Sequence, residues 1–511
     1  MTTALTQAEI NQRVLSSDQP TDKLGARTVR GGAIAVGAQI FRAVLQLVGV
    51  AMLARLLTPE QFGLVAMGST VMALVSVLTE LNITTATIQR EKLTQDDASG
   101  AFWLNLAMAA MALVLALIAI PATTLLFHDA RVHMIVLGLA ATVPISALGA
   151  EHQALLSRNM RWLDVHLIAL AGFVLGLIVA ILAAWLFHAG YWALIIQAWV
   201  TAGATSALSW LRCPWRPSFV KDWRAATSTL HFGLNLSGAM FMSYISRQLD
   251  NVLIGWRWGS VQLGFYSRAY TLLQTPLSFL TGPLGSAMVP AMSQLHSEPQ
   301  KWRNAYIDAL SVITMIGTWM ACLLYGGSST IIDVVLGPGW DETKTIFSFL
   351  VISMLVATPM RTTGWIYMSS GRTDRMLAWA FVGTPMYVIA FIVGLPYGAA
   401  GVALCYSISQ LLAFLPCMWM AVRGTSISMR DVLEAVAVPT IGAIVVGLTL
   451  KMATDQLPLI GDLIAMTLAG LLYGGLLVLA VWTMPIYARL RARALDLLSK
   501  TPWLRAQKSA V

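Results

Sequence analysis

Seven polar or charged residues interrupt long apolar segments of the chain, and they are the candidates for a functional site. They are Arg42, Glu80, Arg247, Asp250, Asn251, Arg268 and Arg361. An arginine at the centre of a membrane helix costs about 2.5–3.5 kcal/mol on insertion scales, so such residues usually face a cavity or a partner. The pattern therefore predicts a polar chamber at membrane depth.

The arginines favour an anionic ligand, because a guanidinium fork matches a phosphate group with two parallel hydrogen bonds. A phosphate-bearing amphiphile could bind there while its lipid tail stays in the bilayer. We expect its binding residues to be Arg42, Arg247, Arg268, Arg361 and Asn251. Two alternatives stay open: Arg268 could lie at the outer interface, and Arg361 could snorkel to an interface.

The two acidic residues are candidates for ion coupling. A carboxylate in a dry cavity can take up a cation as it cycles, so Glu80 or Asp250 could carry a proton or a sodium ion. The structural alternative is an internal ion pair. Asp250 follows Arg247 by three residues and lies on the same helical face, and Arg42 could pair with Glu80. A further acid, Glu151, is interpreted as a structural cap near the inner end of its segment.

Helix breakers gather in the apolar segment 268–292. Pro276, Gly282 and Pro283 lie within it, and a proline frees a carbonyl and bends a helix. We expect this segment to be the hinge of a conformational change, with a static kink as the alternative. Pro144 and Pro359 are expected to bend two other segments.

Membrane-spanning helices must position these residues. Of 511 residues, 57% are hydrophobic and 11% are charged, whereas a soluble domain carries about 25% charge. This composition excludes a large water-soluble catalytic domain. At about 20 residues per span, it predicts an all-α integral membrane protein with about 14 transmembrane helices. The expected helices are 31–55, 62–86, 99–121, 134–155, 164–187, 190–211, 228–254, 268–292, 304–325, 344–369, 376–395, 399–421, 433–452 and 461–484.

Basic residues indicate the orientation, since short cytoplasmic loops retain lysine and arginine. With the N-terminus inside, 24 of the 33 fall on the cytoplasmic side, 6 on the opposite side and 3 within spans. Both termini are therefore expected in the cytoplasm. The net charge of +9 reflects this topology rather than a nucleic-acid site.

Two short motifs recur at a nearly constant offset. The stretch 55–64 resembles 257–265, and both place an arginine before Gln-apolar-Gly-apolar. The stretch 190–194 resembles 400–404. Since transporters are often built from repeated halves, we expect two pseudo-symmetric six-helix lobes, 31–211 and 228–421, joined by a basic linker, 212–227.

The remaining segments complete the expected organisation. A cytoplasmic segment, 1–30, begins the chain, and its polar stretch up to Pro20 is expected to be disordered. Two more helices occupy 422–484. The tail, 485–511, is expected to form a basic amphipathic helix on the inner leaflet, or a plain topology anchor.

No cofactor or metal is expected. The four cysteines form no C-x-x-C pair, and the seven histidines are scattered without i, i+4 pairing. No Walker-type G-x-x-x-x-G-K-[ST] motif occurs. Energy would then come from a proton or sodium gradient, or from removal of the product.

Three strings carry a resemblance to a known family. They are Ala54-Arg55-Leu56-Leu57-Thr58-Pro59-Glu60-Gln61-Phe62-Gly63-Leu64, Leu263-Gly264-Phe265-Tyr266-Ser267-Arg268-Ala269-Tyr270 and Val335-Leu336-Gly337-Pro338-Gly339-Trp340. With them the chain resembles the polysaccharide-transporter family of the multidrug/oligosaccharidyl-lipid/polysaccharide (MOP) superfamily. It resembles in particular the Wzx-type flippases of the colanic-acid-like branch.

The resemblance implies a MATE-like fold with two lobes facing a cationic cavity, which Arg42 and Arg247 would line. It implies that an undecaprenyl-diphosphate-linked oligosaccharide repeat unit moves from the inner to the outer leaflet of a bacterial inner membrane. It further implies contacts with membrane lipids, with a polysaccharide polymerase and with export machinery, and none with nucleic acid.

Two other functions stay open. A drug/cation antiporter of the same superfamily would favour carboxylate-rich spans. An integral-membrane glycan polymerase or ligase would need a sizeable external loop, and the longest external connection here runs only from Tyr325 to Glu342.

An Arg42→Ala, Arg247→Ala double variant tests the predicted cavity. If both guanidinium groups bind the anionic headgroup, polysaccharide export falls while the protein is still made at its normal level. Export is measured as surface glycan in cells that lack the native gene. Full export at normal expression would contradict the prediction.

Overall fold

A computed structural model describes residues 6–15, 24–79, 84, 87–88, 90, 92–220, 224–454, 458–484 and 487–499. Within these ranges the regular structure is helical, with no β-strand, which confirms the all-α prediction. Glu80 lies outside the described residues, and so do the side chains of Arg247 and Pro283.

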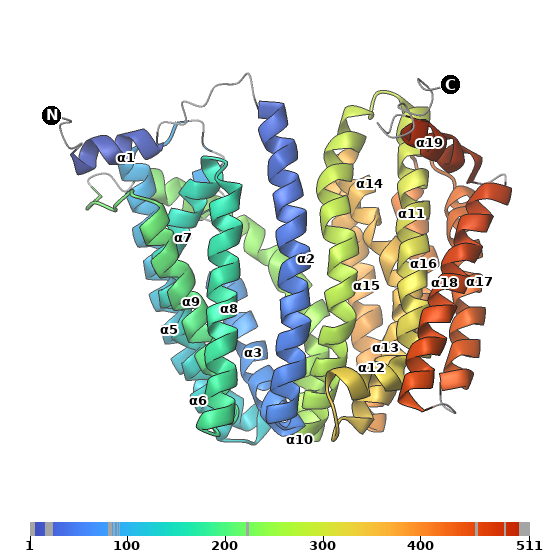
Figure 1. The fold of residues 1–511 in the computed structure, drawn as a ribbon. Helices are drawn as coiled ribbons and strands as arrows, with labels where there is room; N and C mark the ends of the chain where they lie inside the picture. The colour runs from blue at the N-terminus through green and yellow to red at the C-terminus, as the bar shows by residue number, and fades with distance from the viewer. Residues whose placement is uncertain are drawn as a thin grey trace, which may run out of the picture. The chain divides into compact units, whose positions relative to one another are not determined.

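The chain divides into two compact units, each built of long helices that run side by side (Figure 1). The first unit comprises Met1–Arg268, Val335–Trp340 and Leu395–Ala399. The second comprises Ala269–Val334, Asp341–Gly394 and Ala400–Val511. The long helix α10 (Arg224–Gln294) contributes its first part to one unit and its last part to the other.

The first unit also contains α1 (Gln7–Leu15), α2 (Leu24–Leu56), α3 (Pro59–Thr79), α5 (Gln95–Phe127), α6 (Arg131–Ala140), α7 (Thr142–Arg158), α8 (Trp162–Leu186) and α9 (Trp192–Arg212). The second contains α11 (Pro299–Gly326), α12 (Ser328–Val335), α13 (Asp341–Arg361), α14 (Thr363–Ser369), α15 (Thr373–Gly394), α16 (Gly398–Val422), α17 (Met429–Thr454), α18 (Leu459–Thr483) and α19 (Ala488–Ser499). A short 3-10 turn, η2 (Leu395–Tyr397), joins α15 to α16.

Eleven stretches of the described residues are long and apolar enough to cross a membrane, as expected of a multi-pass membrane protein. One of them, Thr373–Val422, contains two of the expected helices, and α10 contains two more. The expected count of fourteen spans is not confirmed by these stretches. The six-helix lobe boundaries stay a prediction.

Two expected helices are interrupted near their prolines. The segment 134–155 is split between α6 and α7, and Pro144 lies in the first turn of α7, where a missing backbone N–H costs little. The segment 344–369 is split at Thr362, three residues after Pro359. The Thr362 hydroxyl donates to the Pro359 carbonyl at 2.7 Å and lies 2.8 Å from the Tyr306 hydroxyl.

The break in α10 lies at a different place from the predicted hinge. Gly259 leaves the helical conformation with φ 78° and ψ −172°, a combination open to glycine because it lacks Cβ. The expected loop between 254 and 268 is otherwise helical. Pro276, Gly282 and Pro283 lie further along α10 in helical backbone, so their role as a hinge stays a prediction.

The repeated Gln-apolar-Gly-apolar motifs pack directly against each other in the first unit. A Cβ on Gly63 of α3 would overlap the Ser260 carbonyl, and a Cβ on Gly264 of α10 would overlap the Pro59 carbonyl. The two backbones can approach this closely only because both positions are glycine. The offset of 201 that relates the two glycines also relates Pro59 to Ser260.

Two aromatic residues beside these glycines meet at one side chain. The rings of Phe62 and Phe265 both contact Trp340, with centroids 5.6 and 6.0 Å away. The glutamines of the two motifs, in contrast, are related by the same offset of 201. The Gln61 amide faces Gly190, and the Gln262 amide faces Gly398. Gly190 and Gly398 both have positive φ, 57° and 77°. The second repeat is therefore matched better by Gly190 with Gly398 than by the stretch that begins at Ala400.

The expectation of disorder up to Pro20 is wrong for the described residues 6–15, which contain α1. Thr6 and Glu9 form a capping box, with the Thr6 backbone N–H donating to the Glu9 carboxylate at 2.7 Å. This hydrogen bond also holds the pKa of Glu9 below its usual value. Leu15 is buried in the first unit, and the Asn159 amide donates to the Val14 carbonyl. The Thr-x-x-Glu signal is present in the sequence.

Gly63→Ala and Gly264→Ala test the backbone crossing. Each methyl group would meet a carbonyl oxygen that cannot rotate away, and overpacking of this kind typically costs about 1–3 kcal/mol. We expect lower thermal stability of the purified protein in detergent for both variants. Gly475→Ala is the control, because nothing lies within 4 Å of its Cβ position. Unchanged melting of the Gly63 and Gly264 variants would argue against the close approach.

Candidate functional site

Arg42 lies in α2 on the side that packs against α8. Its guanidinium carbon is 5.8 Å from the centroid of the Phe173 ring, and the residue as a whole is exposed. One to two turns further along α2, Gly49 admits the side chain of Leu177 from the same face of α8. A neutral aromatic face attracts the cation by about 0.5–1 kcal/mol at an exposed site and leaves its hydrogen-bond donors open.

Arg268 lies against the glycine crossing. Its guanidinium carbon is 4.6 Å from the centroid of the Phe62 ring. Its Nε atom is buried and has no hydrogen-bond partner among the described residues. Phe62 thus contacts both the Trp340 ring and the Arg268 guanidinium.

Asp250 and Asn251 come together with Tyr266 in the first unit. Asp250 is 4% exposed, and its carboxylate accepts hydrogen bonds from the Tyr266 hydroxyl at 2.7 Å and from the Asn251 backbone N–H at 2.8 Å. The Asn251 amide donates to the Gln248 side chain at 2.9 Å. Tyr266 belongs to the string that carried the family resemblance. The Arg247–Asp250 ion pair stays a prediction, because the Arg247 side chain lies outside the described residues.

Arg361 belongs to the second unit, at the end of α13 where Pro359 and Thr362 interrupt the helix. It is exposed, and its guanidinium donates to the Gln274 side chain at 2.9 Å. Both residues line a cavity of about 180 Å³.

The rest of this cavity is rich in neutral hydrogen-bonding groups. The Gln410 amide donates to the Tyr406 hydroxyl at 2.8 Å and accepts from the Tyr387 hydroxyl at 3.3 Å. Sequence reasoning missed Gln274, Tyr387, Tyr406 and Gln410 because it searched for charges. The signal was the i, i+4 spacing of Tyr406 and Gln410 within one apolar segment.

The candidate arginines have neutral partners. Within the described part of its own unit, none of Arg42, Arg268 and Arg361 forms a salt bridge. Their contacts are the rings of Phe173 and Phe62 and the amide of Gln274. The pairing of Arg42 with Glu80 stays untested. A cation that lacks an internal carboxylate can still balance the charge of an anionic ligand.

Comparison with known proteins decides the family. Residues 52–345 match the family described as polysaccharide biosynthesis protein, which is more than half of the chain. The chain belongs to this family. Relatives include the succinoglycan biosynthesis transport protein ExoT of Rhizobium meliloti (strain 1021), 24% identical, with 81% of this chain and 83% of that protein covered. The lipopolysaccharide biosynthesis protein WzxC of Escherichia coli (strain K12) is 21% identical, with 76% and 80% covered.

Solved structures share the fold of this polysaccharide biosynthesis family member. A lipid II flippase MurJ in an inward closed conformation matches with a TM-score of 0.68 at 14% identity, over 87% of this chain and 98% of that chain. An inward-facing multidrug resistance MATE family transporter of the MOP superfamily matches with a TM-score of 0.52 at 15% identity, over 82% and 98%. The expected MATE-like fold is confirmed.

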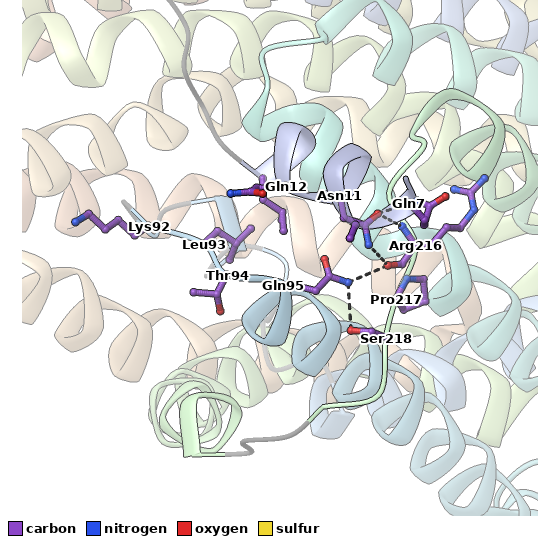
Figure 2. Close-up of a pocket in the computed structure, with 12 residues that line it drawn as sticks. Gln7, Asn11, Gln12, Lys92, Leu93, Thr94, Gln95, Arg216, Pro217 and Ser218 are labelled. Atoms are coloured by element: carbon purple, nitrogen blue, oxygen red, sulfur yellow. Dashed lines mark hydrogen bonds between the residues drawn. The ribbon is translucent and has the colours of Figure 1, made fainter. Parts of the chain in front are cut away.

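A larger cavity of about 800 Å³ lies in the first unit of this family member and was not predicted (Figure 2). Its walls come from α1, residues 92–95 and residues 216–218. The Asn11 amide donates to the Arg216 carbonyl at 2.9 Å and accepts from the Arg216 backbone N–H at 3.0 Å. The Gln95 amide also donates to the Arg216 carbonyl, at 3.0 Å (Figure 2).

The cysteines and the metal-ligating residue types were predicted to form no metal site. All four cysteines are free thiols. Among the described residues, no group of three or more His, Cys, Asp or Glu could hold a metal ion.

Tyr266→Phe tests the Asp250 cluster. The change removes one hydroxyl and leaves a buried carboxylate with one donor fewer, which costs about 1–3 kcal/mol. We expect a lower melting temperature in detergent, measured beside Tyr397→Phe, a control whose ring is 77% exposed. Equal melting of the two variants would show that the hydrogen bond carries no stability.

Proposed function

We propose that this protein is a flippase that moves undecaprenyl-diphosphate-linked oligosaccharide repeat units from the inner to the outer leaflet of the bacterial inner membrane. Membership of the polysaccharide biosynthesis family supports the pathway. The transport and lipopolysaccharide biosynthesis names of ExoT and WzxC support an exported glycan. The fold shared with a lipid II flippase supports alternating access as the mode of movement.

One observation carries the choice of substrate: arginines inside apolar segments have neutral partners in the described residues. A buried ion pair would have cancelled their charge, whereas an aromatic ring or an amide does not. A diphosphate can then bind through charge-assisted hydrogen bonds, which contribute about 1.5–3 kcal/mol each. The isoprenoid tail can remain in the bilayer.

The cavity around Arg361 suits the part of the substrate next to the diphosphate. Its tyrosine hydroxyls and glutamine amides both donate and accept hydrogen bonds, as sugar hydroxyl groups do. Arg361 and its Gln274 partner would hold a phosphate oxygen, and Tyr387, Tyr406 and Gln410 would face the first sugar.

A drug/cation antiporter is not favoured, because the matched family and the named relatives concern polysaccharide and lipopolysaccharide biosynthesis. We propose transport rather than catalysis. The drive would be a proton or sodium gradient, with Asp250 and Glu80 as the first candidates for coupling. Both termini would lie in the cytoplasm. A glycan polymerase and export machinery would act on the product outside.

Arg361→Ala tests the binding role. Loss of a charge-assisted hydrogen bond, about 1.5–3 kcal/mol, corresponds to about tenfold to hundredfold weaker binding. We expect surface glycan to fall and the lipid-linked repeat unit to accumulate on the inner leaflet, as after deletion of the gene. Arg361→Lys should restore export in part, since it keeps the charge without the fork.

Arg257→Ala is the matched control. Arg257 is also an exposed arginine beside an aromatic ring, 5.2 Å from the Trp258 centroid, but it lies beside the Gly259 break and outside the Arg361 cavity. It should export normally. Normal export by Arg361→Ala, with no accumulated lipid-linked sugar, would refute the binding role.

A further inference from the structure

A glutamate that the proposed mechanism does not use is sealed inside the first unit. Glu151 lies in α7, two turns before the helix ends at Arg158, and is 0% exposed. Neither of its carboxyl oxygens has a hydrogen bond among the described residues. No salt bridge of the described side chains includes it. The interpretation of Glu151 as a helix cap is not supported, because a cap would bond to backbone groups.

The charge state of this carboxyl follows from its surroundings. An ionised carboxylate buried without a partner costs several kcal/mol, even after the protein relaxes around it. A neutral carboxylic acid avoids most of that cost. The group is therefore stable at this position with a proton bound.

Few polar groups near the Glu151 carboxyl could stabilise its ionised form. Beside Glu151 in α7 stands His152, which is also 0% exposed and whose ring nitrogens have no partner among the described residues. The Thr87 hydroxyl lies close to the carboxyl. The Cys213 thiol lies within electrostatic reach of Glu151, and burial raises the pKa of that thiol.

Two cations of this region bind backbone carbonyls. Arg158, two turns along α7, donates to the Thr87 carbonyl at 3.1 Å. Arg216 lies close enough to act on His152. Its guanidinium, however, donates to the carbonyls of Cys213 and Trp215 and stacks 5.1 Å from the Trp210 centroid. It therefore does not neutralise Glu151.

Three packed rings, those of His152, Trp210 and Trp215, lie between Glu151 and the 800 Å³ cavity. His152 stacks on Trp210 with centroids 4.3 Å apart and meets Trp215 at 5.3 Å. Trp215 is 0% exposed, and its indole N–H donates at 2.9 Å to Gln95, which lines the cavity. A shift of residues 213–218 would move Trp215 and open a path from the cavity to His152 and its turn of α7.

The second cover of Glu151 is the segment around Thr87. Arg158 holds it by donating to the carbonyls of Thr87 and Ile88, at 3.1 and 3.3 Å, and to the carbonyl of Arg90. Residues 213–218, by contrast, form a non-helical connection after α9, which can move while the helices stay intact.

We propose that Glu151 is an occluded proton-binding site of the first unit, and that its proton is exchanged with the 800 Å³ cavity when residues 213–218 move. Binding adds one proton to a carboxylate oxygen and breaks no other bond, and release returns it to water. Because only the covered state stabilises the protonated form, proton uptake favours that state. The coupling of this exchange to flipping rests on the proposed function; the proton site itself does not.

Infrared difference spectroscopy of the full-length purified protein tests the site without any substrate. At neutral pH the wild type should show the carbonyl stretch of a protonated carboxylic acid, and Glu151→Gln should lose it. Glu434→Gln is the control, since Glu434 is paired with Arg430 at 2.7 Å on the exposed face of α17. It should keep the band. The compared proteins also carry Asp250→Asn, because Asp250 is a second buried carboxyl that could contribute to the band. A protein with Glu151 intact that lacks the band, or a Glu151→Gln protein that retains it, would overturn the proton site.

The coupling is tested by export with and without the proton gradient. Wild-type export should fall when a protonophore collapses the gradient, and Glu151→Gln should export at one rate in both conditions. An unchanged protonophore response in Glu151→Gln would overturn the coupling. If the infrared band is present but the wild type flips no lipid-linked glycan, the proton site stands and the proposed function fails.

Discussion

The backbone contact between the first turn of α3 and the start of the second half of α10 organises the first unit. Gly63 and Gly264 allow it because any side chain there would overlap a carbonyl of the opposite segment. The residues next to these glycines hold the candidate site. Phe62 lies under Arg268, and Tyr266 donates to Asp250. The motif that packs the helices also positions the charges.

The arginines inside the apolar helices contact neutral groups. Charges inside apolar helices must be balanced or left for a ligand. Arg42, Arg268 and Arg361 meet rings and an amide, whereas Arg131 at the start of α6 and Arg303 in α11 form ion pairs, with Asp129 and Glu60 and with Asp431. The different treatment of the two groups is consistent with a ligand that supplies negative charge only during transport.

Much of this could be predicted from the sequence. Apolar length and the spacing of basic residues predict the helices, and the repeated Gln-apolar-Gly-apolar strings marked the crossing, although not that the two copies touch. Only part of the Arg361 cavity could be predicted from the sequence. Arg361 stood out by its charge, but Gln274 and Tyr387 are ordinary residues whose meeting depends on how separate helices pack. The Gly259 break and the docking of α1 depend on tertiary contacts that periodicity does not report.

The glycine crossing has a further consequence for the origin of the fold. Gly63 meets Ser260 and Gly264 meets Pro59, and the same offset exchanges the members of both pairs. This reciprocity defines an isologous interface, in which one patch of a subunit meets the identical patch of another. A half-length ancestor with a single motif could have made this contact as a two-fold homodimer, and gene fusion would have preserved it without a new surface.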